Sequence, residues 1–345
     1  MLDYVLVLPH YVYGHGGLMA TVQLAEEFQR QGCAVALRFQ KKSDHLDWLK
    51  ATCKVPISVG WCDATFPACK VAITYSDTPN IATLKSLPQV GHVAINMLSY
   101  GMAIERERAN VSTPGITILS PSRRTAALIE AEGFGPVHVK SHGHDWENFY
   151  PEPGIERERA AAVLFHYAPD KRYELAVRIV NRLQESGYID GTYIFGNPLG
   201  YRHGKTPIPK VVKRFYWTAR RSEIREMFSR ASVFIMPSVT EGFNLTPAEA
   251  TLCGCPAILC DGDIGGLFVD EETCCIVERD NEKEMVGAAQ YLLSCPTVAQ
   301  AFRDKIAGIV KNYTWEKAVR FIRGVLGCAT LIFGDGFDTS FLGEL

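Results

Sequence analysis

Short apolar runs alternate with amphipathic segments through the first half of the chain. Each run is a few residues long and predicts a strand, whereas the segments between them place apolar residues at helical spacing. The predicted strands are 5–8, 33–39, 71–75, 92–96 and 115–119, and the predicted helices are 18–31, 78–86 and 121–132. This alternation favours a parallel sheet with helices on both of its faces.

The alternation resumes after residues 151–155, where two Pro and one Gly are typical of a linker. Further strands are predicted at 161–165, 192–196, 211–217, 232–236 and 256–260, and further helices from 173, at 222–230, 281–294 and 297–312, and from Thr314. A length of 345 residues suggests two domains. We therefore predict an α/β fold with two domains that meet near residue 152.

The composition is that of an ordinary soluble globular protein, with 47% hydrophobic and 21% charged residues. A net charge of −2 gives no general field for nucleic acid or membranes, so we expect no nucleic-acid partner and at most peripheral membrane contact. The chain has 11 Cys, begins directly with a strand, shows no signal peptide, and lacks an apolar run long enough to span a membrane. We expect a reducing, cytoplasmic compartment with mostly free thiols.

The most informative stretch is 238–250, which connects the predicted strand 232–236 to a helix. Thr246 suits the N-cap, Pro247 suits the first helical position, and Glu249 lies three residues after the cap. Open α/β sheets bind ligands at the carboxyl ends of their strands. Backbone N–H groups at a helix start also attract anions. The stretch is therefore a candidate anion site.

Two carboxylates in an anion site need a ligand that explains them. Ionised Glu241 and Glu249 can only accept hydrogen bonds, so both suit hydroxyl groups, while a phosphate suits the N–H groups. A nucleotide sugar carries both kinds of group. The alternatives are that Glu249 only closes a capping box with Thr246, and that Glu241 is a solvated loop acid.

This stretch resembles the Glu-x7-Glu motif of retaining glycosyltransferases of family four, also called glycosyl transferases group 1. The matching residues are Pro237-Ser238, Glu241-Gly242-Phe243, Glu249-Ala250 and Gly254-Cys255-Pro256. Asn244 replaces a Gly that is usual in the family. The resemblance implies the GT-B fold, in which two Rossmann-like domains face each other across a cleft. It also implies transfer of a sugar from a nucleotide diphosphate sugar with retention at the anomeric carbon.

A second match follows the strand 161–165, where the family reads Gly-Arg-x4-Lys-Gly and uses the Arg and Lys to hold the donor diphosphate. Lys171 is at the Lys position, His166 replaces the Arg, and Arg172 replaces the last Gly. Substituting His for Arg weakens a charged phosphate contact unless Arg172 or a charged His166 compensates. For Lys171 and Arg172 the alternative is an ordinary surface charge.

In the first domain, Gly16 and Gly17 lie between a strand and a helix and are candidates for a phosphate cradle. A plain turn is the alternative. The resemblance implies that this Gly-Gly pair approaches the donor diphosphate. The family's usual His after strand 92–96 is missing, which leaves Asn96 in its place and the donor sugar undetermined.

Three further groups of residues are weaker candidates. Tyr216 and Trp217 offer aromatic faces to the nucleotide base, although core packing explains either residue as well. Gly242, Phe243, Asn244 and Leu245 belong to the donor-binding loop, and His15 and His144 are candidates for acceptor contacts, with a solvated or hinge role as their alternative. Asp261-x-Asp263 resembles a metal motif of another fold, but a turn explains it, so we expect no metal and no cofactor.

The resemblance also assigns domains and roles. Residues 1–151 form the acceptor-side domain, 156–312 the nucleotide-sugar domain, the helix 314–326 returns to the first domain, and 327–345 is a tail. Glu241 and Lys171 are the expected catalytic residues, and Glu249 holds the ribose. The expected donor is a UDP- or GDP-sugar, and the acceptor is a hydroxyl of a glycan, a lipid-linked sugar or a small molecule.

Other activities stay open. A catalytically silent nucleotide-sugar-binding protein and a sugar epimerase or phosphorylase of the same fold are compatible with the same motifs. A nicotinamide dehydrogenase is disfavoured, because neither half carries the complete glycine fingerprint with its ribose-binding acid.

Overall fold

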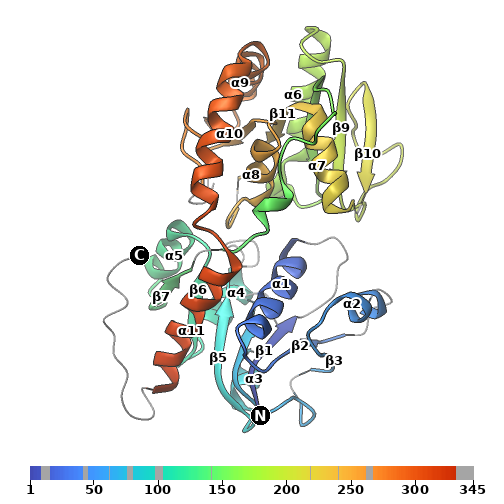
Figure 1. The fold of residues 1–345 in the computed structure, drawn as a ribbon. Coiled ribbons are helices and arrows are strands. Elements are labelled where there is room, and N and C mark those ends of the chain that lie inside the picture. Colours follow the sequence, from blue (N-terminus) through green and yellow to red (C-terminus); the bar gives the residue numbers. More distant parts are fainter. Residues whose placement is uncertain are drawn as a thin grey trace. The chain divides into compact units, whose positions relative to one another are not determined.

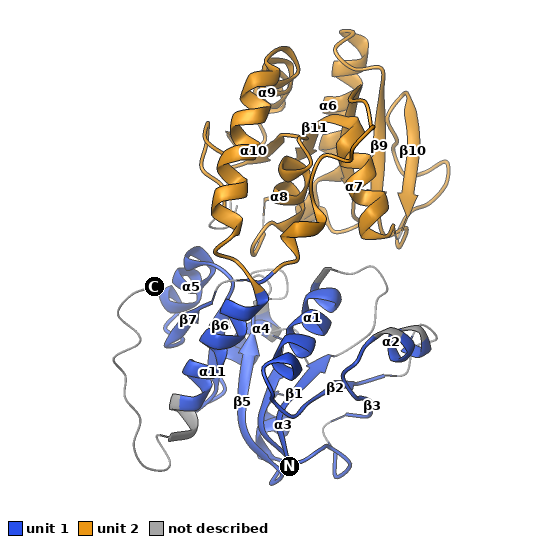
Figure 2. Ribbon diagram, in the orientation of Figure 1, with its two compact units in different colours: residues 1–143, 315–345 blue, residues 144–314 orange. Residues whose placement is uncertain are grey.

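The chain folds into two compact units, shown in different colours in Figure 2. The computed structural model describes residues 1–8, 16–41, 46–61, 63–75, 81–97, 104–140, 142–217, 219–239, 241–261 and 267–331. Unit 1 comprises Met1–Gly143 and Trp315–Leu345, and unit 2 comprises His144–Thr314. Each unit has a parallel sheet of its own, so the predicted α/β class with two Rossmann-like domains is confirmed.

Unit 1 contains a seven-stranded sheet in the order β3-β2-β1-β4-β5-β6-β7 (Figure 1). Its strands are β1 Leu2–Leu8, β2 Val35–Phe39, β3 Ile57–Val59, β4 Cys69–Thr74, β5 Val90–Asn96, β6 Thr117–Ser120 and β7 Val137–Val139. Strand β1 pairs in parallel with β2 and β4, where Leu6 lies opposite Leu37 and Ile73. Strands buried on both faces read as continuous apolar runs, which is the pattern that the sequence shows.

Helices cover both faces of this sheet. They are α1 Gly16–Arg30, α2 Leu46–Thr52, α3 Ile81–Ser86, α4 Ile104–Val111, α5 Arg123–Ala131 and α11 Trp315–Leu331. One core contains Leu6 of β1 together with buried residues of α1, α2 and α11. The other core contains Val5 and Val7 of β1 with residues of α3, α4 and α5. Alternate residues of β1 thus enter opposite cores, as the two-residue period of a strand requires.

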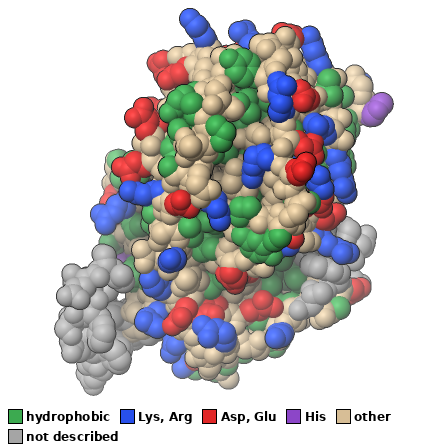
Figure 3. Space-filling model, turned by 45° about the horizontal axis from the view of Figure 1, so that its top comes forward, with side chains coloured by type: hydrophobic (Ala, Val, Ile, Leu, Met, Phe, Trp, Pro, Cys, Tyr) green, Lys and Arg blue, Asp and Glu red, His purple; other side chains and the backbone are tan. Residues whose placement is uncertain are grey.

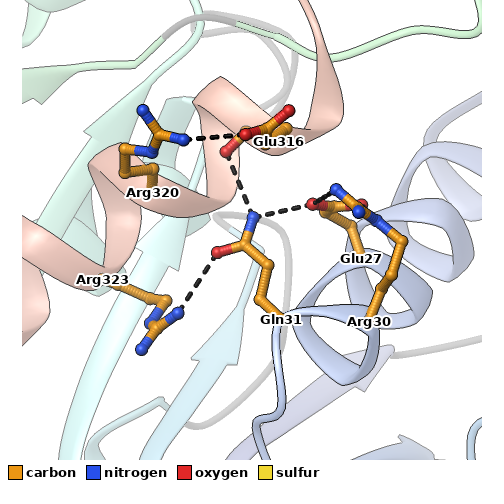
Figure 4. A network of polar contacts seen from close by, with 6 residues as sticks. All are labelled: Glu27, Arg30, Gln31, Glu316, Arg320 and Arg323. Carbon is orange, nitrogen blue, oxygen red and sulfur yellow. Dashed lines mark hydrogen bonds and ion pairs between the residues drawn. The ribbon is translucent and has the colours of Figure 1, made fainter.

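Helix α11 joins unit 1 from the far end of the sequence, and a polar network links it to α1 (Figure 4). The Gln31 amide donates to Glu27 at 2.7 Å and to the Glu316 carbonyl at 3.3 Å, and Arg323 donates to the Gln31 side-chain oxygen at 3.2 Å. The two contacts of Gln31 with α11 are exposed and therefore contribute little. Buried apolar residues of α11, among them Val319 and Ile322, hold the helix in the core.

Unit 2 contains a six-stranded sheet in the order β10-β9-β8-β11-β12-β13. Its strands are β8 Glu158–Phe165, β9 Gly191–Gly196, β10 Val212–Trp217, β11 Ala231–Met236, β12 Ala257–Cys260 and β13 Cys275–Val277. Its helices are α6 Tyr173–Glu185, α7 Arg221–Arg230, α8 Leu245–Leu252, α9 Glu282–Ser294 and α10 Pro296–Val310, with short 3₁₀ turns η1 Trp146–Asn148 and η2 Pro169–Lys171. Residues of α6 and α9 share one core, whereas α7, α8 and η1 contribute to the other.

The chain passes from unit 1 to unit 2 before the predicted linker, not within it. Trp146 and Phe149 are buried in the core of unit 2. The Trp146 indole N–H also donates to the Tyr313 carbonyl at 2.7 Å. These anchors place residues 144–151 in unit 2, so its limits differ from the expected 156–312. The sequence places the linker at Pro151–Ile155 because Pro and Gly accumulate there, yet the Glu152 N–H donates to the Ser229 hydroxyl at 2.8 Å within unit 2.

The start of α8 also differs from the prediction. The helix begins at Leu245, and its cap is Asn244 in a left-handed conformation with φ 60°, not Thr246. Asn tolerates this conformation better than most residues, which lets the chain turn into the helix two residues earlier. The capping-box alternative for Glu249 is therefore wrong, because Glu249 does not lie three residues after the cap.

The surface carries both signs of charge. On the face drawn in Figure 3, Lys and Arg side chains are interspersed with Asp and Glu. Within the described ranges, no helix combines the length and the apolar character needed to cross a bilayer.

Candidate functional site

The site is built where β8 and β11 lie side by side at the centre of the sheet of unit 2. From β8 the chain continues to β9 on one side, whereas β11 leads to β12 on the other. Such a reversal of strand order opens a crevice at the carboxyl ends of the strands. The loops after the two strands are joined there, because the Val239 N–H donates to the Asp170 carbonyl at 3.0 Å.

Lys171 and Glu241 form an ion pair in this position. The Lys171 Nζ donates to the Glu241 Oε1 at 2.7 Å, and the Asp170 Oδ2 lies 3.7 Å from the same Nζ. Both side chains of the pair are only 15% exposed. Burial raises the pKa of Glu241, and the Lys171 ammonium opposes that shift. The structure thus brings together the two residues that the sequence analysis expects to be catalytic.

Three buried polar atoms around this pair lack a well-formed hydrogen bond among the described residues: the Ser238 hydroxyl, the Asn244 Oδ1 and the Asp170 Oδ2. The Ser238 hydroxyl interacts with the Glu241 carboxylate and the Asp170 Oδ2 lies near the Lys171 ammonium, whereas the Asn244 Oδ1 has no such contact. Ser238 and Asn244 are each 6% exposed. Buried polar groups are rarely left without a hydrogen bond in native proteins, so each of these atoms calls for an additional partner. Together they favour a polar ligand at this edge of the sheet.

Glu249, on α8, lies against His144. The His144 Nε2 is 2.7 Å from the Glu249 Oε1, and the His144 side chain is 6% exposed. The imidazole also packs edge-on against Trp146 and is stacked against Phe149, with ring centroids 4.5 and 5.5 Å away. His144 is the first residue of unit 2. The sequence analysis treats it as a candidate for acceptor contacts, whereas the structure places it beside the expected ribose-binding carboxylate.

The two residues on either side of the Lys171 loop make local contacts. The His166 Nδ1 accepts a hydrogen bond from the Ala168 N–H at 3.1 Å, and the imidazole stacks on Tyr167 at 5.0 Å between centroids. Arg172 caps α6 in a left-handed conformation with φ 52° and forms an ion pair with Asp280, while its Nη1 is buried without a partner among the described residues. Arg172 thus keeps a backbone conformation with positive φ, although it replaces the Gly that is usual in the family at this position.

The aromatic candidates at the end of β10 belong to opposite faces of the sheet. Tyr216 is buried, and the Arg214 guanidinium lies 4.5 Å from its ring centroid. Trp217 stacks on Phe215 at 5.2 Å and contacts Phe165 edge-on at 5.4 Å. Successive strand residues point in opposite directions, so these two rings are not available to one face of the same base.

Residues 242–245 form the start of α8 and the loop before it. Gly242, Phe243 and Asn244 are buried and Leu245 is half-buried. The Phe243 ring lies 5.3 Å from that of Tyr313. Packing of this kind holds the loop backbone in place beside Glu241.

The remaining candidates belong to unit 1. Gly16 and Gly17 open α1, and the Gly17 carbonyl accepts a hydrogen bond from the Thr21 hydroxyl at 2.7 Å. Asn96 ends β5, is 4% exposed, and has an Oδ1 without a partner among the described residues. His15 lies outside the described residues.

Two contributors to the site escaped the sequence analysis. Asp170 contacts Lys171, and Ser238 was quoted only as part of a motif. The signal for Asp170 is its place beside Lys171 after a buried strand. For Ser238 the only signal is its position two residues after β11.

Comparison with known proteins finds similarity to glycosyltransferases. The model of the family described as Glycosyl transferases group 1 matches residues 162–295. A 231-residue region is 32% identical to the lipopolysaccharide core biosynthesis mannosyltransferase LpsB of Rhizobium meliloti, covering 60% of this chain and 64% of that protein. A 144-residue region is 27% identical to the alpha-galactosylglucosyldiacylglycerol synthase of Streptococcus pneumoniae, covering 41% and 38%. The chain thus matches less than two thirds of the length of these curated relatives.

A solved structure supports the fold over nearly the whole chain. Anabaena HepE, determined in complex with UDP-glucose, superposes with a TM-score of 0.76 at 11% identity, and the match covers 95% of this chain and all of HepE. Identity this low is informative about the fold alone. Residues 162–295, which make up most of unit 2, are thus similar to the glycosyl transferases group 1 family, and the chain as a whole has the GT-B fold.

Proposed function

We propose that this protein transfers a sugar from a nucleotide diphosphate sugar to an acceptor hydroxyl, with retention at the anomeric carbon. The observation that carries the proposal is the largely buried Lys171–Glu241 pair at the junction of β8 and β11, with the buried Asn244 Oδ1 nearby, which has no hydrogen-bond partner among the described residues. The names of relatives agree with it, since LpsB is described as a mannosyltransferase and HepE was determined with UDP-glucose.

Each residue of the pair has a distinct role in this reaction. The Lys171 ammonium stabilises the charge that develops on the departing diphosphate, because a preorganised cation in a sheltered site acts more strongly than in water. Glu241 accepts hydrogen bonds from sugar hydroxyls and favours positive charge at the anomeric carbon. The acceptor proton passes to the departing phosphate.

Glu249 holds the ribose hydroxyls, and His144 positions Glu249. One Glu249 oxygen lies 2.7 Å from the imidazole, and a carboxylate has further lone pairs for two hydroxyls. His144 is a positioning residue in this scheme, since its place is beside Glu249 and not at the reacting atoms.

His144→Ala should therefore raise the KM for the donor by about 3–10-fold while changing kcat much less, because it removes the imidazole that lies against the Glu249 carboxylate, and one polar contact contributes about 1 kcal/mol. His144→Gln keeps a donor near Glu249 and should recover part of the loss. Steady-state kinetics with varied donor concentration separates the two parameters. Equal losses of kcat in both variants would place His144 in the chemical step and contradict this role.

The donor is proposed to be a UDP- or GDP-sugar, and the acceptor a glycan, a lipid-linked sugar or a small molecule. We propose that the reaction uses no resident metal and no cofactor. A cytoplasmic, reducing compartment is supported by the free thiols of the nine described cysteines, five of them buried.

A second function, a catalytically silent nucleotide-sugar-binding protein, is favoured by one observation. The His166 Nδ1 is engaged by the Ala168 N–H, and Arg172 pairs with Asp280, so the diphosphate has one fewer dedicated cation than the motif of the family supplies.

Incubation with UDP-glucose and GDP-mannose separates these functions. A glycosyltransferase releases the nucleoside diphosphate, slowly into water and faster with a suitable acceptor. A binding protein retains the intact donor, and an epimerase or phosphorylase yields a free sugar or a sugar phosphate. Binding of either donor without any release of the diphosphate, over an acceptor panel of glycans and lipid-linked sugars, would overturn the transfer proposal.

A further inference from the structure

The crossover between β9 and β10 differs from its neighbours in unit 2. The chain passes from β8 to β9 through α6 and from β10 to β11 through α7, whereas residues 197–211 connect β9 to β10 without a helix. Parallel strands are usually joined by a helix that packs on the sheet. Here a loop takes that place, beside the start of α6.

A pocket of about 700 Å³ opens between this loop and α6. Phe165, at the end of β8, and Tyr173, at the start of α6, contribute its apolar part. Arg172 and Arg178 line it from the side of α6, and Arg202 and Lys205 line it from the loop. Lys171 and Glu241 do not line this pocket, whereas His166 and Arg172, which the sequence analysis assigns to donor binding, do. The pocket therefore adjoins the proposed donor site without containing its Lys171–Glu241 pair.

The charges of the lining residues favour an anion. Arg172 is paired with Asp280, and Arg178 with Glu282 at 2.9 Å. By contrast, the side chains of Arg202 and Lys205 form no ion pair with any residue that the structure describes. Glu174 also lines the pocket and is outnumbered there by four cationic side chains. A guanidinium presents its donors in a planar fork that matches the oxygens of a phosphate.

Two buried polar groups point to the same conclusion. Tyr173 is 5% exposed, and its hydroxyl has no partner among the described residues. The Nη1 of Arg172 is also buried and has no hydrogen-bond partner among the described residues. Both groups donate hydrogen bonds, so both call for an acceptor, and phosphate oxygens supply several. The Tyr173 ring is held by an edge-on contact with Phe165 at 4.9 Å, which fixes its position in the wall.

We propose that this pocket is a second ligand site, which binds a small phosphate monoester. The phosphate lies among Arg172, Arg202 and Lys205, and the rest of the ligand packs toward Phe165. The loop 197–211 forms one wall of the site in place of a crossover helix. Binding here does not depend on sugar transfer.

Titration calorimetry of the full-length protein with inorganic phosphate and with glycerol 3-phosphate tests the site. The double variant Arg202→Ala/Lys205→Ala should weaken binding of both probes at least about tenfold, since each charged hydrogen bond to phosphate is among the stronger kind. Lys210→Ala/Lys213→Ala is the matched control. It removes two cations from the same stretch that pair with Glu185 and Glu158 and do not line the pocket, so affinity should stay within about twofold.

Tyr173→Phe adds an independent readout, since it removes only the hydroxyl and should weaken glycerol 3-phosphate binding without altering the fold. UDP, bound in the presence of saturating glycerol 3-phosphate, should keep its affinity if the two sites are distinct.

The proposal is overturned if the wild-type protein binds neither probe at millimolar concentration, if the double variant binds as tightly as the wild type, or if UDP displaces the probe competitively. Loss of the second site leaves the proposed transfer activity untouched, so the two proposals fail separately.

Discussion

Glu241→Gln should lower the rate of sugar transfer by about 10²–10³-fold, the range observed when one preorganised electrostatic group is removed from an active site. The amide keeps the shape of the side chain and removes its negative charge. In the proposed reaction that charge faces the anomeric carbon as positive charge develops there, so the loss is expected in kcat. The measurement is release of the nucleoside diphosphate from the donor, with and without acceptor.

The same variant should bind the nucleoside diphosphate at least as tightly as the wild type. Lys171 is paired with Glu241 at 2.7 Å, and removing that carboxylate leaves more of the ammonium's charge for the diphosphate. Asp170, 3.7 Å from the ammonium, remains as a partner, so the fold should persist. A fall in kcat with unchanged or improved UDP affinity is thus the expected signature.

Glu226→Gln provides the matched control. Glu226 is an acid of the same unit that pairs with Arg230 at 3.1 Å on the surface of α7. Its replacement should leave both rate and affinity near the wild-type values, since exposed ion pairs contribute little. Near-normal transfer by the Glu241 variant, with circular dichroism unchanged, would remove Glu241 from the chemistry.

The sequence predicts the architecture well because buried parallel strands leave a strong pattern. The run at 161–165 lies within β8, and the helix predicted from 173 begins at Tyr173. The short strands β3 and β7 were missed, since each has only three residues and none of them is buried. An apolar pattern of that length is not distinguishable from a loop.

The sequence names the residues of the candidate site but does not predict their pairings. Lys171 and Glu241 are 70 residues apart, and they meet because β8 and β11 are neighbours, which depends on the strand order. The contact between His144 and Glu249 depends on where the chain enters unit 2. The local sequence around these residues shows neither the strand order nor the point where the chain enters unit 2. The left-handed cap Asn244 was not predictable from the local sequence either, because the conformation of a cap is set by the loop around it.

Lys140→Met should raise the free energy of unfolding at pH 7 by about 1–3 kcal/mol, given that one pKa unit corresponds to about 1.4 kcal/mol. Lys140 follows β7 in unit 1 and is 1% exposed. Burial lowers its pKa from 10.5 to about 8. At pH 7 the ammonium is charged in the folded and the unfolded protein alike, and its burial costs stability that an unbranched apolar side chain does not lose.

The pH dependence identifies the cause. Between pH 8 and pH 10.5 the unfolded chain binds the Lys140 proton more tightly than the folded chain, so this residue makes wild-type stability rise with pH. The variant lacks that contribution, and the difference between the two proteins should shrink across the window and level off above it. Urea unfolding of both proteins at pH 7, 8, 9 and 10 measures the difference directly, while other groups that titrate in this range cancel.

Lys50→Met is the appropriate control, since Lys50 lies on α2 of the same unit with 47% of its side chain exposed. Its replacement should change stability by less than about 0.5 kcal/mol, as for most exposed positions, and by the same amount at every pH. A Lys140 variant that is no more stable than the wild type at pH 7 would mean that the ammonium has a compensating partner. A gain that persists unchanged to pH 10 would instead assign the effect to packing, because only the charge is lost on deprotonation.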